Sequence, residues 1–428
     1  MGMTIAEKIL ARQSGQARVR PGDLVVAQVE TCVLLDTHFN RHSGWRWPTR
    51  LHDPDKVALI ADHIVMAATP ESAIGLRAMR KVAAYYGIKR VDDAGAEQGI
   101  SHQIIADKGY ALPGTLLANP DSHTLSAGAF NCAARGLGRP ELLRILCTGA
   151  TWYLMAPTVR YELVGELPKG VSAKDAFLYL AGRWGSHDNL NIEFGGSAQA
   201  GLSMNARRTL STMCAEVSAE FAIWEPDDLM VAHMKARTDR PFFPTMPDVD
   251  AEYVDVRTID LSKLEPYVSG IDTVMHNTQT LSSFKEKIRL DQCVVGSCAN
   301  GTMDDLAIVA DIVRGRKVAP WVRFFVTPGS QAIYREAARA GLLATIAESG
   351  ALITPAACGA CAAQDFGALA PGEICLTATT RNYKGRMGNS DAQIHMASPA
   401  TVAASAITGY ITHPRDLPVL SAAEVAPA

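Results

Sequence analysis

Short apolar runs alternate along the chain with longer stretches in which apolar residues recur every three or four positions. Residues 293–296, Cys-Val-Val-Gly, predict a short buried strand, and residues 297–301 predict a turn. Residues 303–314 then predict a helix that begins with acidic residues and ends before Gly315. The apolar positions that fall on one face of this helix are Leu306, Val309, Ile312 and Val313.

The same alternation continues toward the C-terminus. We expect a strand at 323–326, a helix at 331–340 and a strand at 352–353 that leads into the loop of Cys358. Strands that alternate with helices indicate an α/β fold with parallel sheets. Two cysteine loops therefore follow strands, at the sheet edge where α/β proteins usually build their sites.

Composition and charge narrow the class of protein. The 428 residues, 48% hydrophobic and 20% charged, are too many for one core and fit two or three domains. The net charge is -3, and no basic run is interleaved with aromatic residues, so we expect no nucleic-acid surface. Small anions need only a local group of arginines, which the net charge does not reveal.

Three features of the sequence indicate where in the cell the protein is located: its first residues, its apolar stretches and its cysteines. The start of the chain lacks a signal-peptide pattern, and Thr4 and Glu7 have the spacing of a helix capping box. The longest apolar stretch, 400–411, is short and rich in Ala, Ser and Thr, so no membrane span is expected. Nine cysteines without a secretion signal indicate reduced thiols and a cytoplasmic protein.

Three cysteines carry the most specific chemical signal, namely Cys298 and the pair Cys358 and Cys361. A common iron-sulfur cluster has four thiolate ligands, so three would leave one metal open to act as a Lewis acid. A zinc half-site, a redox pair and coincidence are the alternatives for a lone Cys-x-x-Cys. A zinc site would need a fourth ligand at matching spacing. The motif of a redox pair would have to lie on the first turn of a helix.

The neighbours of these cysteines, together with motifs elsewhere, resemble the aconitase superfamily, most closely the large-subunit family of 3-isopropylmalate dehydratases. The resemblance covers almost the whole chain and rests on six motifs in the family's order. They are Asp62-His63, residues 99–103 (Gly-Ile-Ser-His-Gln), 121–124 (Asp-Ser-His-Thr), 296–301 (Gly-Ser-Cys-Ala-Asn-Gly), 358–361 (Cys-Gly-Ala-Cys) and 381–386 (Arg-Asn-Tyr-Lys-Gly-Arg).

The resemblance implies three α/β/α domains of aconitase type around a 4Fe-4S cluster, without the swivel domain. We place them at 1–155, 156–275 and 276–428, with softer connections near Ala156-Pro157 and at 238–250. Cys298, Cys358 and Cys361 would hold the cluster. The implied reaction is reversible loss or addition of water on a small hydroxy-dicarboxylate or hydroxy-tricarboxylate.

The resemblance also implies roles for the acid-base residues. His63, with Asp62, would donate a proton to the leaving hydroxyl, and His102, Asp121, His123 and Glu216 would form the surrounding network. Such a reaction needs a Lewis acid, a proton donor, a base and cations for the carboxylates, so these residue types suit it. We expect His38, His187 and His395 to be ordinary core or surface histidines.

Arg381 and Arg386, with Thr380 beside them, are the expected substrate-binding residues, because a guanidinium binds a carboxylate bidentately. A solvated loop with structural ion pairs is the alternative. The family usually has Asn where this chain has Thr212 and Thr380, which removes an amide donor and adds a methyl group. We therefore expect an altered pocket.

The base that removes the carbon-bound proton belongs, in this family, to a mobile fourth domain or a separate small protein. The chain ends soon after the third domain, around Thr408 to Leu420, so we expect a small-subunit partner that carries this domain. The resemblance implies 3-isopropylmalate as the best guess for the substrate. Maleate, citraconate and dimethylmaleate are the competing alternatives, ahead of homoaconitate and aconitate. An RNA-binding regulator and a structural zinc protein are hypotheses of other classes.

Overall fold

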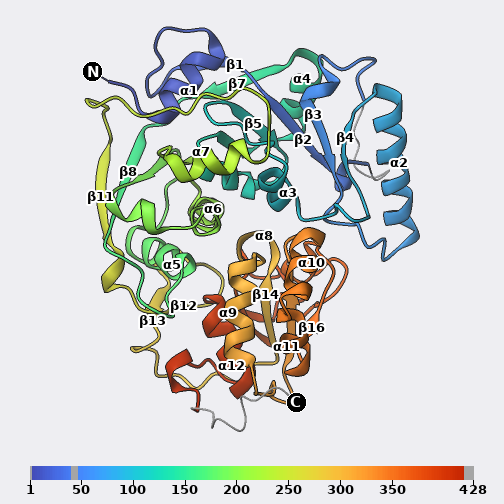
Figure 1. Ribbon diagram of the computed structural model, residues 1–428, viewed down its shortest axis with the longest axis vertical. Coiled ribbons are helices and arrows are strands. Elements are labelled where there is room, and N and C mark those ends of the chain that lie inside the picture. The colour runs from blue at the N-terminus through green and yellow to red at the C-terminus, as the bar shows by residue number, and fades with distance from the viewer. Residues whose placement is uncertain (1, 40–46, 419–428) are drawn as a thin grey trace. The chain divides into compact units, whose positions relative to one another are not determined.

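The computed structural model describes residues 2–39 and 47–418, so Leu420 and the last residues of the predicted third domain, 276–428, lie outside the described residues. The chain divides into two compact units. Unit 1 comprises Met1–Ala94, Ser101–Glu166 and Ser186–Ser262, and unit 2 comprises Gly95–Ile100, Leu167–Gly185 and Lys263–Ala428. Many of their helices and strands are labelled in Figure 1.

Unit 1 contains a five-stranded sheet in which every pairing is parallel and the strand order is β4-β3-β2-β5-β6. Residues of β2, β3 and β5 are buried along their whole length, as expected for a parallel sheet covered on both faces. The strands are β2 (Thr31–Leu35), β3 (Val57–Ile60), β4 (Arg90–Asp92), β5 (Leu116–Asn119) and β6 (Ala133–Gly136). The helices of this part are α1 (Ile5–Ser14), α2 (Pro70–Tyr86), α3 (Ser101–Asp107) and α4 (Arg139–Thr148), and the 3-10 helix η4 spans Ser122–Phe130.

Unit 1 also contains a four-stranded parallel sheet and a two-stranded antiparallel sheet. The larger one has the order β10-β9-β8-β11, with bounds β8 (Thr158–Val164), β9 (Asn191–Gly195), β10 (Ala222–Trp224) and β11 (Asp255–Asp260). Helices α6 (Met204–Met213) and α7 (Asp228–Lys235) and the 3-10 turn η6 (Cys214–Val217) follow β9 or β10. The smaller sheet pairs β1 (Leu24–Gln28) with β7 (Ala150–Leu154).

Unit 2 is built on a second five-stranded parallel sheet, ordered β16-β15-β14-β17-β18. Its core gathers apolar side chains of β14, α9 and α12, including Val295, Val309 and Val402. The strands are β14 (Gln292–Gly296), β15 (Arg323–Thr327), β16 (Leu352–Ile353), β17 (Ile374–Thr377) and β18 (Gln393–Met396), and β12 (Tyr267–Ser269) pairs separately with β13 (Thr278–Thr280). The helices are α5 (Ala173–Trp184), α8 (Ser297–Asn300), α9 (Met303–Val313), α10 (Gln331–Arg339), α11 (Leu342–Glu348) and α12 (Pro399–Thr408).

The strand and helix predictions around the cysteines are confirmed. β14, α9, β15, α10 and β16 occur at the expected positions, with Leu306, Val309 and Val313 buried and Ile312 partly buried. The predicted turn at 297–301 was wrong in one detail, because Ser297–Asn300 forms the short helix α8. The capping box of Thr4 and Glu7 is present. In the described part of the chain, no helix is both long and apolar enough to cross a membrane.

The three-domain division stays a prediction. The three larger sheets fall one in each of the ranges 1–155, 156–275 and 276–428, but α5 and β12, which lie in 156–275, belong to unit 2, whereas β8 to β11 belong to unit 1. The connection at 238–250 lacks helix and strand, as expected, and lies within unit 1.

Candidate active site

A carboxylate-imidazole pair in unit 1 is formed by two consecutive residues. The Nδ1 atom of His63 lies 2.6 Å from Oδ1 of Asp62, and the backbone N–H of Ser101 donates to the other oxygen of Asp62 at 2.9 Å. The loop that carries the pair follows β3 and is held by the buried Asp36, at the end of β2. The carboxylate of Asp36 accepts the backbone N–H groups of Asp62, His63 and Ile64 at 2.8 to 3.3 Å.

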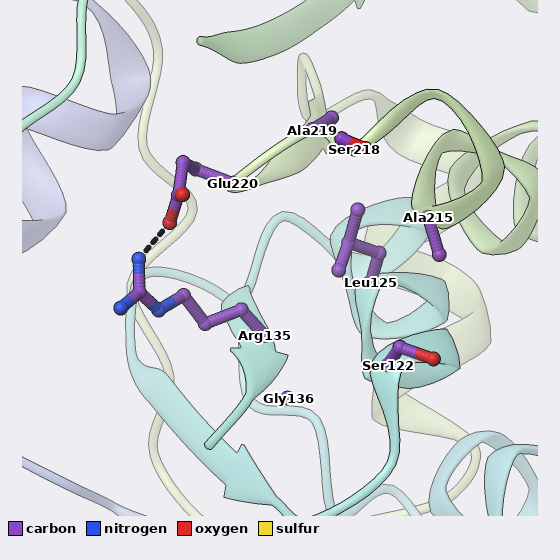
Figure 2. A pocket seen from close by; sticks show the side chains of 8 residues that line it. All are labelled: Ser122, Leu125, Arg135, Gly136, Ala215, Ser218, Ala219 and Glu220. Atoms are coloured by element: carbon purple, nitrogen blue, oxygen red, sulfur yellow. Dashed lines mark ion pairs between the residues drawn. The ribbon is translucent and has the colours of Figure 1, made fainter. Parts of the chain in front are cut away.

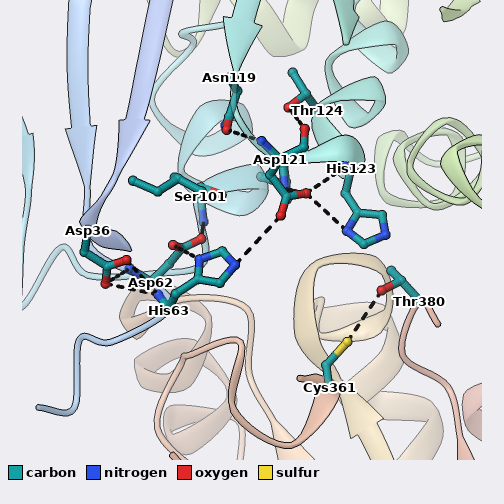
Figure 3. Close-up of polar contacts among 12 residues, drawn as sticks. Asp36, Asp62, His63, Ser101, Asn119, Asp121, His123, Thr124, Cys361 and Thr380 are labelled. Atoms are coloured by element: carbon teal, nitrogen blue, oxygen red, sulfur yellow. Dashed lines mark hydrogen bonds and ion pairs between the residues drawn. The ribbon is translucent and has the colours of Figure 1, made fainter. Parts of the chain in front are cut away.

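The charges of this pair are set by their surroundings (Figure 3). Burial opposes the charged imidazolium of His63, but the adjacent Asp62, its hydrogen bond, and the charges of Asp121 and Asp36 outweigh burial and raise the pKa of His63 to about 10. In return, His63 and the N–H of Ser101 outweigh burial and lower the pKa of Asp62. Burial and the charge of Asp62 raise the pKa of Asp36 to about 7. His63 therefore holds its proton at neutral pH.

Asp121 joins three histidines. Its Oδ1 atom lies 3.1 Å from Nε2 of His102 and accepts the backbone N–H of His123 at 2.7 Å, while Oδ2 lies 3.8 Å from Nε2 of His63. Hydrogen bonds from His102 and His123 outweigh burial and hold the pKa of Asp121 well below its ordinary value. The backbone N–H of Asp121 donates to the side chain of Asn119, the last residue of β5, which fixes the turn after the strand.

Glu216 completes the network from a different part of unit 1. It lies in η6, and its Oε1 atom is 2.9 Å from Nε2 of His123. The rings of His102 and His123 stand nearly perpendicular, with centroids 6.0 Å apart. The structure thus brings together all six predicted acid-base residues in an alternating series of carboxylates and imidazoles: Asp62, His63, His102, Asp121, His123 and Glu216.

Two subsets of these residues are compact enough to surround an ion. Ligand atoms of His102, Asp121 and His123 lie within 4.8 Å of one another, and so do those of Asp36, Asp62 and His63. Their shortest contacts are nevertheless hydrogen bonds between carboxylates and imidazoles or backbone N–H groups. This arrangement suits storage and transfer of protons.

The predicted cluster cysteines lie in unit 2, in loops that follow its parallel strands. Cys298 belongs to α8, directly after β14, and Cys358 and Cys361 follow β16, with Cys361 in the 3-10 turn Gly359–Cys361. All three are buried. The chain turns sharply before Cys298, where Ser297 has a φ of 65°. At Gly296, with a φ of 127°, a Cβ would lie 2.1 Å from the carbonyl oxygen of Thr327, so only glycine fits.

The sulfur of Cys361 is surrounded by donors. The hydroxyl of Thr380 lies 3.5 Å from it (Figure 3). The Nη2 atom of Arg386 donates to it at 3.6 Å. The hydrogen bond with Cys358 first, then the charge of Arg386 and the threonine hydroxyls, outweigh burial and lower the pKa of Cys361 well below its ordinary value. The charges of Cys361 and Cys358 raise the pKa of Arg386. These donors favour the thiolate form of Cys361, which is the form that binds metals.

Lys174 supports the segment that carries Thr380. It lies in the first turn of α5 with its side chain fully buried, and its Nζ atom donates to the carbonyl oxygen of Thr379 at 2.8 Å. Arg381 follows Thr380 directly and is partly exposed. A buried ammonium costs free energy unless it is well bonded, so Lys174 fixes the backbone immediately before Arg381.

A pocket of about 280 Å³ adjoins the acid-base network in unit 1 (Figure 2). Its charged residues, Arg135 and Glu220, form an ion pair with each other, so its wall offers no unpaired cation to a dicarboxylate. We therefore do not assign the substrate to it. The lining residues are Ser122, Leu125, Arg135, Gly136, Ala215, Ser218, Ala219 and Glu220.

Comparison with known proteins identifies the family of this chain. The model of the aconitase family (aconitate hydratase) matches residues 46–409. The chain belongs to the aconitase family. It is 50% identical to the 3-isopropylmalate dehydratase large subunit of Mycolicibacterium smegmatis, over 97% of both chains. It is 36% identical to the 3-isopropylmalate dehydratase large subunit of Halothermothrix orenii, over 97% of this chain and 100% of that one.

A solved structure was also matched, the holo-form of aconitase X from Thermococcus kodakaraensis. Its TM-score is 0.48 at 12% identity, covering 85% of this chain and 87% of that one. The aconitase-type fold assigned here rests instead on the family match and on the parallel sheets with their covering helices.

Sequence reasoning missed two supporting residues of this aconitase-family chain. One is Asp36, whose place directly after the apolar strand β2 was a usable signal. Lys174 gave no signal, because a lysine near a helix start usually faces solvent. The hydroxyl of Thr212 donates to the carbonyl oxygen of Arg208 at 2.7 Å within its own helix. The altered pocket expected from Thr212 stays a prediction.

The three histidines expected to be ordinary are buried and bonded. Nδ1 of His38 lies 3.2 Å from the carbonyl oxygen of Leu35, and Nδ1 of His395 lies 2.9 Å from that of Ser269. His187 contacts Tyr161 and Arg257. Their contacts are structural ones, as expected.

Proposed function

We propose that this chain is the large subunit of a hydro-lyase that reversibly removes water from 3-isopropylmalate. The observation that carries the proposal is the Asp62-His63 pair, in which a buried carboxylate holds an imidazolium charged at neutral pH. Loss of hydroxide from a 2-hydroxy acid needs a proton at the leaving oxygen. Relatives with 50% and 36% identity over nearly the full chain carry the name 3-isopropylmalate dehydratase large subunit.

We assign a 4Fe-4S cluster to Cys298, Cys358 and Cys361. Within the described ranges, the groups of three or more ligand atoms within 4.8 Å of one another contain no cysteine. A tetrahedral zinc ion bound by three thiolates would bring their sulfurs within roughly 4 Å of one another. The three sulfurs do not all lie that close together, although those of Cys358 and Cys361 share a hydrogen bond. Three buried cysteines, with the thiolate form of Cys361 favoured, suit a cluster that takes one sulfur at each of three corners. When bound, a cluster with three protein ligands supplies a Lewis acid to the substrate hydroxyl.

His63 acts as the acid in dehydration. Its Nδ1 is occupied by Asp62, so the proton leaves from Nε2 and joins the departing hydroxyl to form water. In hydration, Nε2 takes the proton back. Asp36 fixes the backbone of both residues, which keeps the ring in one orientation through the cycle.

The network of His102, Asp121, His123 and Glu216 holds the water that enters or leaves. Asp121 accepts from His102 and from the backbone of His123, and Glu216 orients the ring of His123. Each imidazole therefore keeps a defined tautomer with respect to its carboxylate.

Arg381 and Arg386 bind the substrate carboxylates. Within the described residues no carboxylate pairs with Arg386, and its buried Nε atom has no hydrogen-bond partner. A cation with an unused donor is ready to accept an anion. Thr380 completes this group through its contact with Cys361.

The base for the carbon-bound proton is proposed to come from a small subunit that carries the swivel domain. The relatives' designation as large subunits supports a two-subunit enzyme. We also propose that the enzyme works in the cytoplasm, where its nine cysteines, none of which forms a disulfide in the structure, stay reduced.

Hydration assays test directly which substrate the enzyme prefers. The chain is co-expressed with its small subunit, and kcat/KM is compared for isopropylmaleate, maleate, citraconate, dimethylmaleate and homoaconitate. We expect isopropylmaleate to lead by more than about tenfold, or about 1.4 kcal/mol. A smaller lead contradicts the assignment to 3-isopropylmalate. A lead for citraconate or dimethylmaleate would support a hydratase of smaller substrates, the function favoured by threonine at position 380.

A further inference from the structure

The residue that follows Arg381 is anchored to a turn elsewhere in unit 2. Asn382 is buried, whereas Arg381 before it is partly exposed. The side-chain Nδ2 atom of Asn382 donates to the carbonyl oxygen of Gly270 at 2.9 Å. It also lies 3.2 Å from Oγ of Ser269 and 3.4 Å from the carbonyl oxygen of Thr273. The amide of Asn382 therefore ties the loop of Arg381, between β17 and β18, to the turn that follows β12.

This turn is closed by its own hydrogen bonds. It spans residues 270–277, between β12 and β13, and the backbone N–H of Gly270 donates to the carbonyl oxygen of Asn277 at 2.8 Å. The side-chain Nδ2 atom of Asn277 donates back across the turn, to the carbonyl oxygens of Ile271 at 2.9 Å and of Thr273 at 3.0 Å. The carbonyl oxygens that Asn382 contacts are thus held in place from within the turn.

Ser269 fastens the same turn to the parallel sheet of unit 2. Its hydroxyl oxygen accepts the backbone N–H of Met396, the last residue of β18, at 2.9 Å, and the amide of Asn382 at 3.2 Å. The hydroxyl also donates to the carbonyl oxygen of Gly270 at 2.8 Å. A hydroxyl offers one donor and two acceptor positions, so that of Ser269 is fully used. The turn is therefore fixed to β18, which pairs with β17, the strand that leads into the loop of Arg381.

A second anchor lies on the other side of Arg381. The buried ammonium of Lys174 donates to the carbonyl oxygen of Thr379 at 2.8 Å, two residues before Arg381. The backbone on either side of Arg381 is thus bound to a different element, to α5 by Lys174 and to the turn after β12 by Asn382. A guanidinium that binds a carboxylate bidentately needs a defined position, because a misplacement of about 1 Å can cost roughly 10²-fold in rate.

We propose that Asn382 is a positioning residue for Arg381, which holds the backbone where the guanidinium meets a substrate carboxylate. This inference rests on the proposed function, which gives Arg381 that role. Asn382 acts through Arg381 and not by contact with the substrate, because its amide donors are used by the turn. Since every candidate substrate carries carboxylates, Asn382 raises the affinity for all of them and leaves their order of preference unchanged.

The test compares Asn382→Ala in the wild type and in Arg381→Lys. Each chain is co-expressed with its small subunit and purified anaerobically. Two constants are measured: KM for the hydration of isopropylmaleate, and Kd for succinate, a dicarboxylate that cannot gain or lose water. Asn382→Ala should raise both constants at least about fivefold. In Arg381→Lys, which has already lost the planar fork, the same substitution should change them by less than about twofold.

Asn382→Ala should fold, because the acceptors that lose its amide keep other donors. The carbonyl oxygen of Gly270 retains the hydroxyl of Ser269, and that of Thr273 retains the amide of Asn277. Tm and iron per chain should therefore stay close to those of the wild type. Asn382→Ser is a second variant, whose hydroxyl ends one bond short of the position of Nδ2. If the alanine variant does not fold, the serine variant decides by the same comparison.

Ser390→Ala is the matched control, because Ser390 is exposed in the same loop between β17 and β18. It should change neither KM nor Kd. Unchanged constants in Asn382→Ala overturn the proposal. An equal fold-change in both backgrounds also overturns it, because Asn382 would then act independently of Arg381.

The proposed function fails in a different way. A wild type that hydrates none of the candidate substrates refutes the dehydratase. If Asn382→Ala still weakens succinate binding in that case, and does so only when Arg381 is present, the positioning role of Asn382 stands.

Discussion

Nδ1 of His63 lies 2.6 Å from Oδ1 of Asp62, the residue immediately before it in the chain. Consecutive residues rarely bond side chain to side chain, because an extended backbone sends them to opposite faces. Here three backbone N–H groups of the loop converge on Asp36, which bends the loop until both side chains meet. The acid of the proposed reaction is thus prepared by its own loop before any substrate arrives.

Replacing Asp62 with Asn tests this pair. Asn keeps the shape but removes the charge that holds His63 protonated, so the pKa of His63 should fall from about 10 toward its ordinary 6.5. We expect kcat at neutral pH to fall by roughly 10²- to 10⁴-fold and the alkaline limb of the pH profile to move toward acid. Iron content should be unchanged. An alkaline limb that stays in place would mean that His63 is not the acid.

The same pair makes stability depend on pH. Because the pKa of His63 is raised in the folded protein, its contribution to stability is complete below about pH 6.5 and disappears as the pH rises through about 10. We expect the difference in Tm between the wild type and His63→Gln to shrink steadily from pH 7.5 to 10. This window lies above the pKa of Asp36, which is about 7. A difference that stays constant across it refutes the raised pKa.

Arg381→Lys and Arg386→Lys should differ in a diagnostic way. Lysine keeps the charge of either arginine but loses the planar fork that binds a carboxylate, so both variants should raise KM by roughly tenfold or more. Arg386 also donates to the sulfur of Cys361, so its variant alone should lose iron faster in air. Steady-state kinetics and timed iron assays measure the two effects. Equal iron loss in both variants would contradict the separate roles.

Replacing Lys174 with Met should weaken substrate binding, because the ammonium of Lys174 holds the carbonyl oxygen of Thr379. Removing the ammonium releases the carbonyl that it holds, which loosens the backbone before Arg381. We expect KM to rise at least about fivefold while Tm changes little, because methionine fills the space without a buried charge. Lys169→Met, an exposed lysine just before α5, is the control and should change neither value. A fall in Tm with unchanged KM would make Lys174 purely structural.

The sequence allowed prediction of the elements around the cysteines and of the acid-base residues, for identifiable reasons. Strands such as β14 and helices such as α9 have local apolar periodicity, and the capping box of Thr4 and Glu7 is a local hydrogen-bond pattern. The pairing of His123 with Glu216, which are 93 residues apart, came only from family resemblance. The family itself is confirmed by the match over residues 46–409.

What the sequence did not predict depends on long-range packing. Nothing near Lys174 indicates that its ammonium reaches Thr379, which is 205 residues away. The hydroxyl of Thr212 could have faced a pocket or its own helix, and only the structure shows that it bonds to Arg208. The exposure of Trp152 and Leu154 was equally hidden, because alternation in a strand does not say which of its faces is covered.

One measurement tests the central claim most directly: iron, acid-labile sulfide and zinc per chain after anaerobic purification, for the wild type and two cysteine variants. We expect about four irons and four sulfides in the wild type and in Cys147→Ser, whose cysteine is exposed. Cys361→Ser should retain little of either, because it removes the thiolate that Arg386 and Thr380 stabilise. Zinc without sulfide in the wild type, or a full complement of iron and sulfide in Cys361→Ser, would contradict the cluster and the dehydratase chemistry built on it.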